Sequence, residues 1–345
     1  MSKKVGWGII GCGVIGPTHA VAINEVEDAA LVATCDVIPE RAEAMAKQYN
    51  AAHWYTDYNE MLKRDDIDVV SICVPSGLHG EVAEAAAKAG KHVFTEKPME
   101  ITKAKIDRMI QVCREEGVKL GCVFQMRTVA ANIIARQTIQ EGRLGTMVLA
   151  DCYQKYYRSP EYYKSADWRA TWELDGGGAL MNQCVHGIDL LLWMVGSPVE
   201  SVVAQAEHLV RDIVVEDTAV ALLKFKNGAM GVIEGTTSCN PGQKARFDIH
   251  GNDGTIILEN GQIVQWHVPD MPKPEIKSPK EAGEVYKDPK ALSKHGHIVL
   301  VKDMTEAILH DRQPMITGEE ARKAVDLILA IYESAQNNRR VYLNN

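Results

Sequence analysis

A glycine-rich turn between an apolar run and a helix candidate constrains this chain most strongly. The segment IIGCGVIGPTHA places Gly11, Gly13 and Gly16 directly after the apolar run 5–10. Here the first glycine permits a tight turn, the second lets the main chain approach a pyrophosphate, and the third allows close packing of helix on strand. A pyrophosphate would then lie at the helix N-terminus, where unpaired N–H groups favour anions.

An acidic residue stands at the spacing that such a turn requires. Asp36 ends the next apolar run, 30–36. Its carboxylate would accept hydrogen bonds from ribose hydroxyls and repel a 2′-phosphate, so NAD is favoured over NADP. Arg41 could hold a 2′-phosphate, but its position also suits a plain surface role. A glycine turn without a ligand is the alternative, and the register of strand, turn, helix and acid argues against it.

The pattern of the chain changes near residue 125. Before it, apolar strand candidates alternate with amphipathic helix candidates, which is typical of a parallel sheet with right-handed crossovers. After it come β-rich runs with the Asn-Gly hairpin signals KNGA and ENGQ. We expect an α/β dinucleotide-binding domain over 1–125. An α+β domain with a large open, mainly antiparallel sheet should follow over 126–345.

Four helix candidates accompany the β-rich runs, and a loop rich in Lys, Pro and Asp (269–290) precedes the last two. These candidates span 128–141, 179–195, 297–311 and 318–336. Because helices are expected on one face of the sheet only, the other face needs a partner. We therefore expect a homodimer or a homotetramer.

Composition excludes several classes of protein. The net charge is −8 and the charges are interspersed, so no basic stripe for nucleic acid is present. The longest apolar stretch, near LLLWMV, is too short to span a membrane. The eight cysteines form no CxxC pair, which fits a reducing compartment, and MSKKVGWGIIGCG does not read as a signal peptide. We expect a cytoplasmic protein and assign no metal site.

Two motifs at strand ends are candidates for the reacting side of the cofactor. CVPSGLH (73–79) and TEKP (95–98) each follow an apolar run, and a doubly wound sheet binds ligands beyond the carboxyl ends of its strands. The proline after Lys97 excludes helix there, so the turn can aim the lysine into the cleft. A solvated Glu-Lys loop pair is the alternative. The expected rim residues are Pro75, Ser76, His79, Glu96 and Lys97.

A second constellation lies in WRATWELDGGGALMNQCVHGIDLLLWMVG, residues 168–196. Three glycines introduce a helix candidate on which Asn182 and His186 share a face, and Asp189 follows His186 by three residues. The pKa of an imidazole suits removal of a hydroxyl proton near neutrality. A histidine in this setting is about as often a packed core residue.

The motifs GxGxxG, CVPSGLH, EKP and GGGALMNQ-x-x-H-x-x-D, in this order and spacing, resemble the Gfo/Idh/MocA family of sugar and cyclitol oxidoreductases. The likeness is strong over 5–127 and 167–196. It implies a Rossmann domain, an open-sheet α+β domain and a nicotinamide cofactor. The family's EKP lysine and helix histidine flank the reacting carbinol and match Lys97 and His186. Further implied cofactor contacts, with those of the glycine turn, are Gly11, Gly13, Val14, Ile15, Gly16, Asp36 and Gln125.

This sequence departs from the family at one site position. Asn182 stands where the family often has a carboxylate four residues before the histidine. Because an amide cannot relay a proton, His186 would act with a hydroxyl, a water molecule or Lys97. His297, at the start of a late helix, is a further candidate for the pocket wall.

The stretch YQKYYRSPEYYKSADWRATW (153–172) suggests a sugar pocket, since aromatic faces stack on pyranose rings and polar groups bind the hydroxyls. Part of these aromatics could instead pack the domain junction. The substrate candidates are Lys97, Arg158, Trp168, Arg169, Trp172, Asn182 and His186.

The WR-x-TWxxDGGGALMNQ pattern is similar to family enzymes that oxidise the 3-hydroxyl of glucose-type rings, whether free, glycosidic or nucleotide-linked. We expect an NAD-dependent dehydrogenase acting on such a CH–OH group. A cyclitol (inositol) dehydrogenase and the family's NAD-dependent glycosidase remain alternatives. A non-catalytic dinucleotide-binding regulator is a third, against which the presence of both Lys97 and His186 argues.

Overall fold

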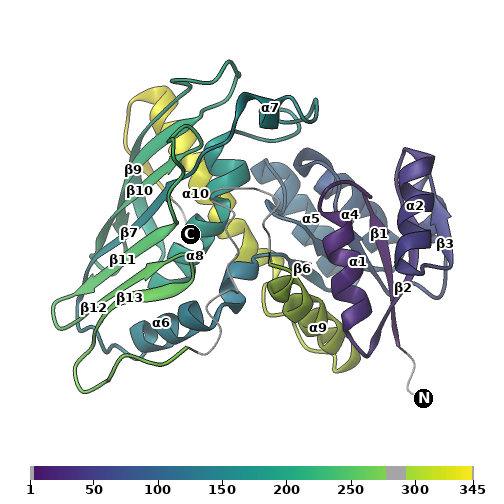
Figure 1. The fold of residues 1–345 in the computed structure, drawn as a ribbon, viewed down its shortest axis with the longest axis horizontal. Helices are drawn as coiled ribbons and strands as arrows, with labels where there is room; N and C mark the ends of the chain where they lie inside the picture. The colour runs from purple at the N-terminus through teal and green to yellow at the C-terminus, as the bar shows by residue number, and fades with distance from the viewer. Residues whose placement is uncertain (1–3, 277–292, 344–345) are drawn as a thin grey trace. The chain divides into compact units, whose positions relative to one another are not determined.

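The chain folds into two compact units, described by a computed structural model over residues 4–276 and 293–343 (Figure 1). The first unit comprises Met1–Gln125 and Lys294–Arg322, and the second comprises Met126–Ser293 and Lys323–Asn345. Residues 294–322, which the sequence division placed in the second domain, thus belong to the first unit. Residues 277–290 of the predicted Lys- and Pro-rich loop lie outside the described part of the chain.

The first unit is built on a six-stranded parallel sheet, which confirms the predicted α/β fold. Its strand order is β3-β2-β1-β4-β5-β6, so the order reverses between the neighbouring strands β1 and β4. Ligands of doubly wound sheets bind at such a reversal, beyond the carboxyl ends of the strands. The strands are β1 (Val5–Ile10), β2 (Ala29–Cys35), β3 (His53–Tyr55), β4 (Val69–Ile72), β5 (His92–Thr95) and β6 (Leu120–Cys122).

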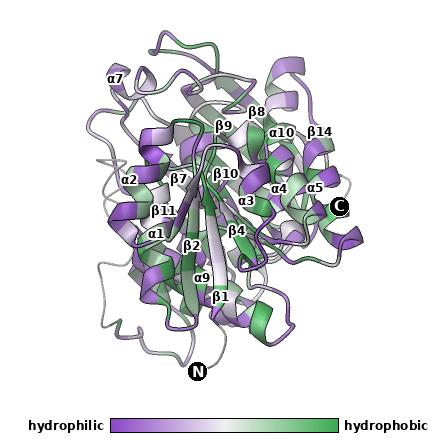
Figure 2. Ribbon diagram, turned by 90° about the vertical axis from the view of Figure 1, so that its right-hand side faces the viewer, coloured by the Kyte–Doolittle hydropathy of each residue, from purple (hydrophilic) through white to green (hydrophobic). Residues whose placement is uncertain are grey.

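Helices cover the sheet because its central strands are apolar along their whole length. All six residues of β1 are buried, and Trp7 on β1 meets Phe94 on β5 edge to face at 5.5 Å. Figure 2 shows β2 and β4 mainly in the hydrophobic colour and more hydrophilic residues on the outer helix α2. The helices are α1 (Gly16–Glu25), α2 (Pro39–Tyr49), α3 (Tyr58–Leu62), α4 (His79–Lys88), α5 (Lys103–Glu115) and α9 (His295–Leu309).

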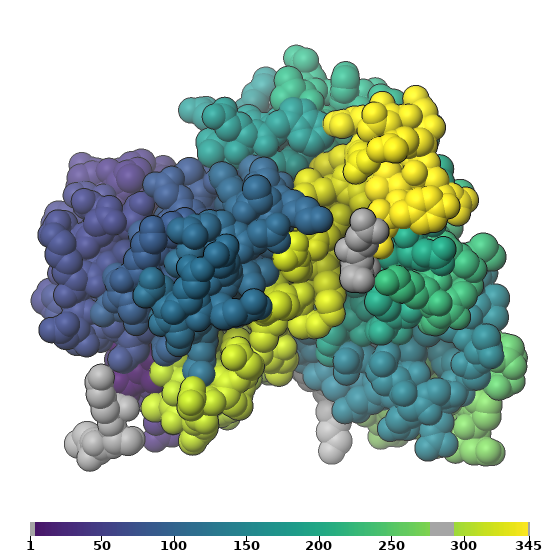
Figure 3. Space-filling view, turned by 180° about the vertical axis from the view of Figure 1, so that it is seen from behind, coloured from purple at the N-terminus to yellow at the C-terminus, as the bar shows by residue number. Residues whose placement is uncertain are grey.

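The helix α9 reaches the first unit from a distant part of the sequence. It packs on α1 and also contacts β1. Figure 3 shows this segment in yellow-green against the purple and blue residues of the first unit. The buried residues of α9 include His297, Leu300, Val301 and Met304, so its apolar face completes the core beside α1.

The second unit contains the predicted open, mainly antiparallel sheet. Its eight strands lie in the order β13-β12-β11-β7-β10-β9-β8-β14, and only the central pair β7 and β10 is parallel. The strands are β7 (Met147–Lys155), β8 (Val199–Glu207), β9 (Thr218–Phe225), β10 (Met230–Thr236), β11 (Arg246–Gly251), β12 (Thr255–Glu259), β13 (Gln262–His267) and β14 (Val341–Tyr342). The accompanying helices are α6 (Ala130–Gln140), α7 (Pro160–Tyr163), α8 (Val185–Val195) and α10 (Gly318–Asn337).

The predicted helix over 179–195 differs from the structure in its first half. Ala179–Cys184 form a π-helical turn, and the regular helix α8 begins only at Val185. The glycines before it allow a very close approach, since a Cβ on Gly178 would lie 1.8 Å from the carbonyl oxygen of Glu216. Single π-turns are frequent at functional sites.

Within residues 4–276 and 293–343, no helix has the length and apolar character that crossing a bilayer requires.

Candidate active site

The glycine turn has the geometry expected of a dinucleotide site. Gly11 has a φ of +99°, and a Cβ there would lie 2.5 Å from the carbonyl oxygen of Cys73. A Cβ on Gly16 would lie 2.7 Å from the carbonyl oxygen of Gly11, whereas one on Gly13 would meet nothing within 4 Å. Gly11 and Gly16 thus serve internal packing, and the main chain at Gly13 stays open to a ligand.

The start of α1 is suited to an anion. No side chain caps this helix at Ile15, and its first turn carries no acidic residue. The adjacent Val14 is 72% exposed. A helix N-terminus without a side-chain cap offers its N–H groups and the positive end of its dipole to a phosphate. The residues present therefore fit the pyrophosphate of a dinucleotide.

Asp36 is held in place over the same turn. Its Oδ2 accepts the main-chain N–H of Cys12 at 2.8 Å, and its Oδ1 accepts that of Ile38 at 2.9 Å. These bonds fix the carboxylate at the end of β2, where ribose hydroxyls would reach it. Arg41 lies on the exposed face of α2. This position agrees with the plain surface role considered for it from the sequence.

The two strand-end loops are joined by a buried histidine. The ring of His79 is 1% exposed, with Nδ1 2.8 Å from the carbonyl oxygen of Pro98 and Nε2 2.9 Å from that of Val74. Burial lowers the pKa of His79. This arrangement gives His79 a structural role between the loops, while Pro75 and Ser76 stay candidates for cofactor contact.

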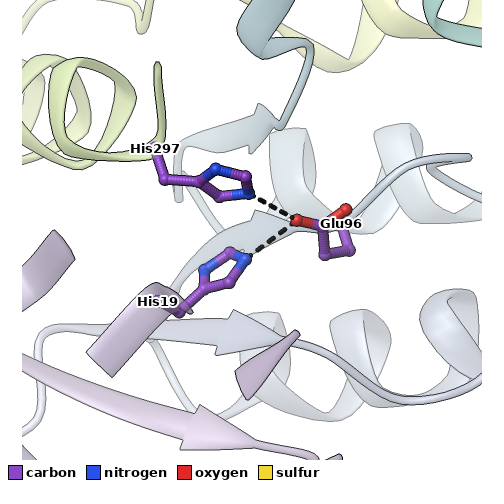
Figure 4. Close-up of side chains that lie close together, drawn as sticks. All are labelled: His19, Glu96 and His297. Atoms are coloured by element: carbon purple, nitrogen blue, oxygen red, sulfur yellow. Dashed lines mark hydrogen bonds and ion pairs between the residues drawn. The ribbon is translucent and has the colours of Figure 1, made fainter. Parts of the chain in front are cut away.

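Glu96 lies inside the first unit and is hydrogen-bonded on both oxygens. Its Oε1 is 2.9 Å from Nε2 of His19 and 3.1 Å from Nε2 of His297, as Figure 4 shows. Its Oε2 accepts the main-chain N–H of Lys97 at 3.1 Å. Lys97 itself is half-buried and forms a cis peptide bond with Pro98.

Neither histidine at Glu96 could be assigned from the sequence. His19 was not singled out at all. His297 was expected in a pocket wall, but it is 1% exposed and packed inside the first unit. They stand 77 and 201 residues from Glu96, and no local spacing signals such distant contacts.

In the second unit a polar network centres on Gln183, a residue that the sequence did not single out. Its Oε1 accepts Nε and Nη2 of Arg158 at 3.0 and 2.7 Å. Its Nε2 donates to Oη of Tyr162 at 2.7 Å and to Oδ1 of Asn182 at 2.6 Å. We call these residues, with Arg169 and Asp175, the Gln183 network.

The network continues to a buried carboxylate and to an aromatic pair. Asn182 Nδ2 donates to Oδ1 of Asp175 at 2.6 Å, and the other oxygen of this 3% exposed carboxylate accepts a main-chain N–H. Arg169 donates to Tyr162 Oη at 2.7 Å and lies over the rings of Tyr162 and Trp168. The predicted residues Arg158, Trp168, Arg169 and Asn182 therefore lie together.

Two residues near the network point elsewhere. The indole N–H of Trp172 donates to the carbonyl oxygen of Val214 at 2.9 Å, and its ring contacts Tyr332 edge to face. Asp189, one turn beyond His186, forms a buried bidentate ion pair with Arg127 at 2.6 and 2.8 Å.

His186 is half-buried in the first turn of α8. Lys97 belongs to the first unit, and His186 and the network belong to the second.

The buried carboxyl of Glu216 is hydrogen-bonded to the main chain at the start of the π-turn. Its carboxyl accepts the N–H groups of Gly178 and Leu180, both at 2.8 Å, and the hydroxyl of Tyr332 at 2.8 Å. Burial raises the pKa of Glu216 to about 7, although these hydrogen bonds oppose the shift. The carboxyl thus fixes the segment from which Asn182 and Gln183 extend.

Comparison with known proteins identifies the architecture. The model of the oxidoreductase family with an NAD-binding Rossmann fold matches residues 5–124, and that of the Gfo/Idh/MocA C-terminal domain matches residues 133–257. The chain belongs to the Gfo/Idh/MocA oxidoreductase family. This Gfo/Idh/MocA protein is accordingly an NAD-binding oxidoreductase, as its motifs predicted.

Relatives of this Gfo/Idh/MocA protein match between 73% and 99% of its length. The WlbA dehydrogenase of Bordetella pertussis, solved in complex with NADH and UDP-GlcNAcA, is 34% identical, with a TM-score of 0.89 over 99% of this chain and 100% of that chain. The myo-inositol 2-dehydrogenase of Thermotoga maritima is 27% identical over 97% of this chain and 98% of that protein. A levoglucosan dehydrogenase of Pseudarthrobacter phenanthrenivorans is 28% identical over 73% of this chain and 72% of that protein.

The raised pKa of Glu216 predicts a pH-dependent contribution to stability. Between pH 4.5 and 7 the folded chain keeps a proton that the unfolded chain loses, so the free energy of unfolding falls as pH rises. Glutamine does not titrate. As the pH rises from 4.5 to 8, the free energy of unfolding of Glu216→Gln should therefore increase by about 3 kcal/mol relative to that of wild type.

Urea unfolding of both proteins across this pH range measures the difference. Glu207→Gln, which changes an exposed carboxylate on β8, is the matched control and should show a constant offset. A constant offset for Glu216→Gln as well would contradict the assigned protonation.

Proposed function

We propose that this protein is an NAD-dependent dehydrogenase that oxidises a ring hydroxyl, at C3, of a pyranose sugar or glycoside. The Gln183 network carries the proposal. It gathers Arg, Asn and Gln side chains beside the rings of Tyr162 and Trp168, next to the helix of His186. Such donors and acceptors recognise a ring that carries several hydroxyls, while aromatic faces pack on its C–H surface. UDP-GlcNAcA and levoglucosan, with which one relative is solved and another is named, contain hexose rings of this kind.

The reaction needs a hydride acceptor and a base. Bound NAD supplies the acceptor for the hydride that leaves the carbinol carbon. The family resemblance assigns the two remaining roles: His186 takes the hydroxyl proton on its imidazole, and the Lys97 side chain donates a hydrogen bond to the substrate. Lys97 follows the strand-end carboxylate Glu96, which fixes its main chain. His186 stands on α8 directly after the π-turn.

Asn182 has a positioning role in this scheme. Its amide donates to Asp175 and accepts from Gln183, so its orientation is fixed by two neighbours. A fixed amide presents defined hydrogen-bonding atoms but carries no proton between groups. The proton that His186 takes from the substrate must therefore pass to a group other than Asn182, and the simplest acceptor is solvent.

A cyclitol dehydrogenase is the second candidate. It is favoured by the likeness to the myo-inositol 2-dehydrogenase, which extends over 97% of this chain. An inositol ring offers the same array of hydroxyls but no anomeric substituent. The two candidates therefore differ in the substrate that gives turnover, and the site chemistry is shared.

A substrate panel tests the function and the catalytic assignments together. NADH formation is followed with glucose, glucosides, UDP-linked N-acetyl sugars and inositols, each with NAD and with NADP. We expect turnover on a pyranose, with a loss of about 100-fold or more in Lys97→Ala and His186→Ala, because positioned proton-transfer groups contribute that much. The controls Lys103→Ala and His208→Ala change exposed residues and should behave as wild type.

Each result of the panel has a distinct meaning. Turnover only on inositols selects the cyclitol enzyme. Silence with NAD bound points to the glycosidase chemistry or to a regulator and overturns the dehydrogenase. Full turnover in Lys97→Ala contradicts its assignment to chemistry.

The cofactor preference depends on Asp36. Without its carboxylate, no charge at the end of β2 repels a 2′-phosphate. Asp36→Ala should therefore lower the ratio of kcat/KM for NAD to that for NADP by about tenfold or more. Glu40→Ala, which removes an exposed carboxylate from the first turn of α2, is the control. A wild-type enzyme that already prefers NADP would refute the role of Asp36.

The outer face of the second sheet suggests self-association into a homodimer or homotetramer. Leu222 on β9 is 59% exposed and is paired in register with Val203 on β8 and Val232 on β10. Val220 and Met230 extend the apolar strip. A contiguous apolar strip on a sheet face is typical of a protein interface.

Substitution in this strip tests the association. Leu222→Glu should lower the mass measured by light scattering to that of one chain, because a buried charge opposes the interface. Leu309→Glu, on the half-exposed end of α9, should leave it unchanged. An assembly that survives Leu222→Glu would exclude this face.

A further inference from the structure

Three side chains from distant parts of the chain meet inside the first unit. His19 comes from α1, Glu96 follows β5, and His297 comes from the first turn of α9. Both imidazoles approach the same oxygen, Oε1 of Glu96, at 2.9 and 3.1 Å (Figure 4). The three residues are 0%, 7% and 1% exposed. We call them the His–Glu–His cluster.

The hydrogen bonds determine the protonation of the cluster. An ionised carboxylate only accepts, so both Nε2 atoms carry hydrogen. Nδ1 of His19 then accepts the hydroxyl of Ser71 at 2.6 Å. Nδ1 of His297 has no hydrogen-bond partner among the described residues, which fits a lone pair better than an N–H group. Burial lowers the pKa of His19, and despite burial the two histidines hold the pKa of Glu96 well below its usual range.

The cluster also has a composition that could hold a metal ion, since its ligand atoms lie within 4.8 Å of one another. Its geometry favours hydrogen bonding instead. Both Nε2 atoms are at hydrogen-bond distance from one oxygen, and the second oxygen accepts the N–H of Lys97. With both carboxylate oxygens engaged, the charge of Glu96 is satisfied by protein donors alone.

We propose that His19 and His297 are positioning residues for Lys97. This inference rests on the catalytic role proposed above for Lys97. One oxygen of Glu96 is fixed by the two imidazoles, and the other holds the main chain of the very next residue. The main-chain N–H of Glu96 is bonded to Ile72 on β4 at 3.0 Å. The strand end that carries Lys97 is therefore fixed on three sides.

The cluster also connects this strand end to the glycine turn. His19 lies in the first turns of α1, the helix that begins at Gly16 beside the pyrophosphate position. The segment that carries His297 follows seven of the eight strands of the second sheet along the chain, yet it belongs to the first unit and packs on α1. The imidazole of His297 supplies the second hydrogen-bond donor to Glu96, so this segment contributes to the strand end that carries Lys97.

Matched substitutions at His297 separate positioning from simple packing. Glutamine keeps an N–H group near the position of Nε2, whereas leucine has similar volume and no donor. In His297→Leu we expect kcat to fall about tenfold or more, with the Kd of NADH within about threefold of wild type, because the bond lost is to a charged group. His297→Gln should recover most of kcat.

A second readout does not depend on turnover. N-acetoxysuccinimide acetylates exposed lysines, and peptide mass spectrometry gives the rate at each one. Lys97 should react about tenfold faster in His297→Leu, because its strand end opens more often, and near the wild-type rate in His297→Gln. Lys103, which is exposed, provides the internal reference. Ser71→Ala, a milder change that removes the hydroxyl from His19, should shift both readouts in the same direction even if His297→Leu does not fold.

The control is a histidine at the opposite end of the same strand. His92 begins β5, and its Nδ1 accepts the N–H of Lys119 at 3.0 Å. His92→Leu should lower stability but leave both readouts within about twofold of wild type.

The outcomes are distinguishable. Wild-type kcat and Lys97 reactivity in His297→Leu would reduce the cluster to packing and overturn the proposal. A stoichiometric metal in the wild-type protein that is lost in His297→Leu would also overturn it. Faster acetylation of Lys97 with unchanged kcat would uphold the positioning and contradict the catalytic role of Lys97.

Discussion

A buried carboxylate must find donors within the protein, and Glu96 finds them in three separate segments. Its charge lies at the carboxyl end of β5 in a residue that is 7% exposed, where an unpaired ion would cost several kcal/mol. His19, His297 and the main chain of Lys97 satisfy it. The helix after the glycine turn, the strand end and the late helix α9 are thereby tied to one point. This requirement explains why residues 294–322 complete the first unit although seven of the eight strands of the second sheet precede them.

The second unit solves a similar problem around the neutral amide of Gln183. Gln183 has two donors and one acceptor atom, and Arg158, Tyr162 and Asn182 engage all of them. Because every member fixes the next, the network presents an ordered polar surface beside α8. Behind it, the carboxyl of Glu216 holds Gly178 and Leu180 at the π-turn. Gly177 and Gly178 are needed there because side chains at these positions would collide with Tyr332 and Glu216.

The sequence predicted the local parts of this arrangement well. The apolar run 5–10 forms β1, and the helix candidates over 297–311 and 318–336 correspond to α9 and α10 within two residues, since periodicity, proline and glycine act within a few residues. The short elements β3, α3 and α7 were missed because three to five residues carry too little pattern. The π-turn was predicted as ordinary helix, because a widened turn has no distinct sequence period. Asp189 was expected near His186 from its spacing, yet its carboxylate turns to Arg127.

The sequence by itself determined the cofactor class and the family. A strand, a turn, a helix and an acidic residue lie within one short segment, so their spacing along the chain largely determines how they are arranged in space. Only the tertiary structure decided which side chains support the lysine and the polar network. The contacts of Glu96 with His19 and His297, and of Glu216 with Gly178, join residues 77, 201 and 38 positions apart. Burial creates the demand for these hydrogen bonds, and burial is a property of the packed chain.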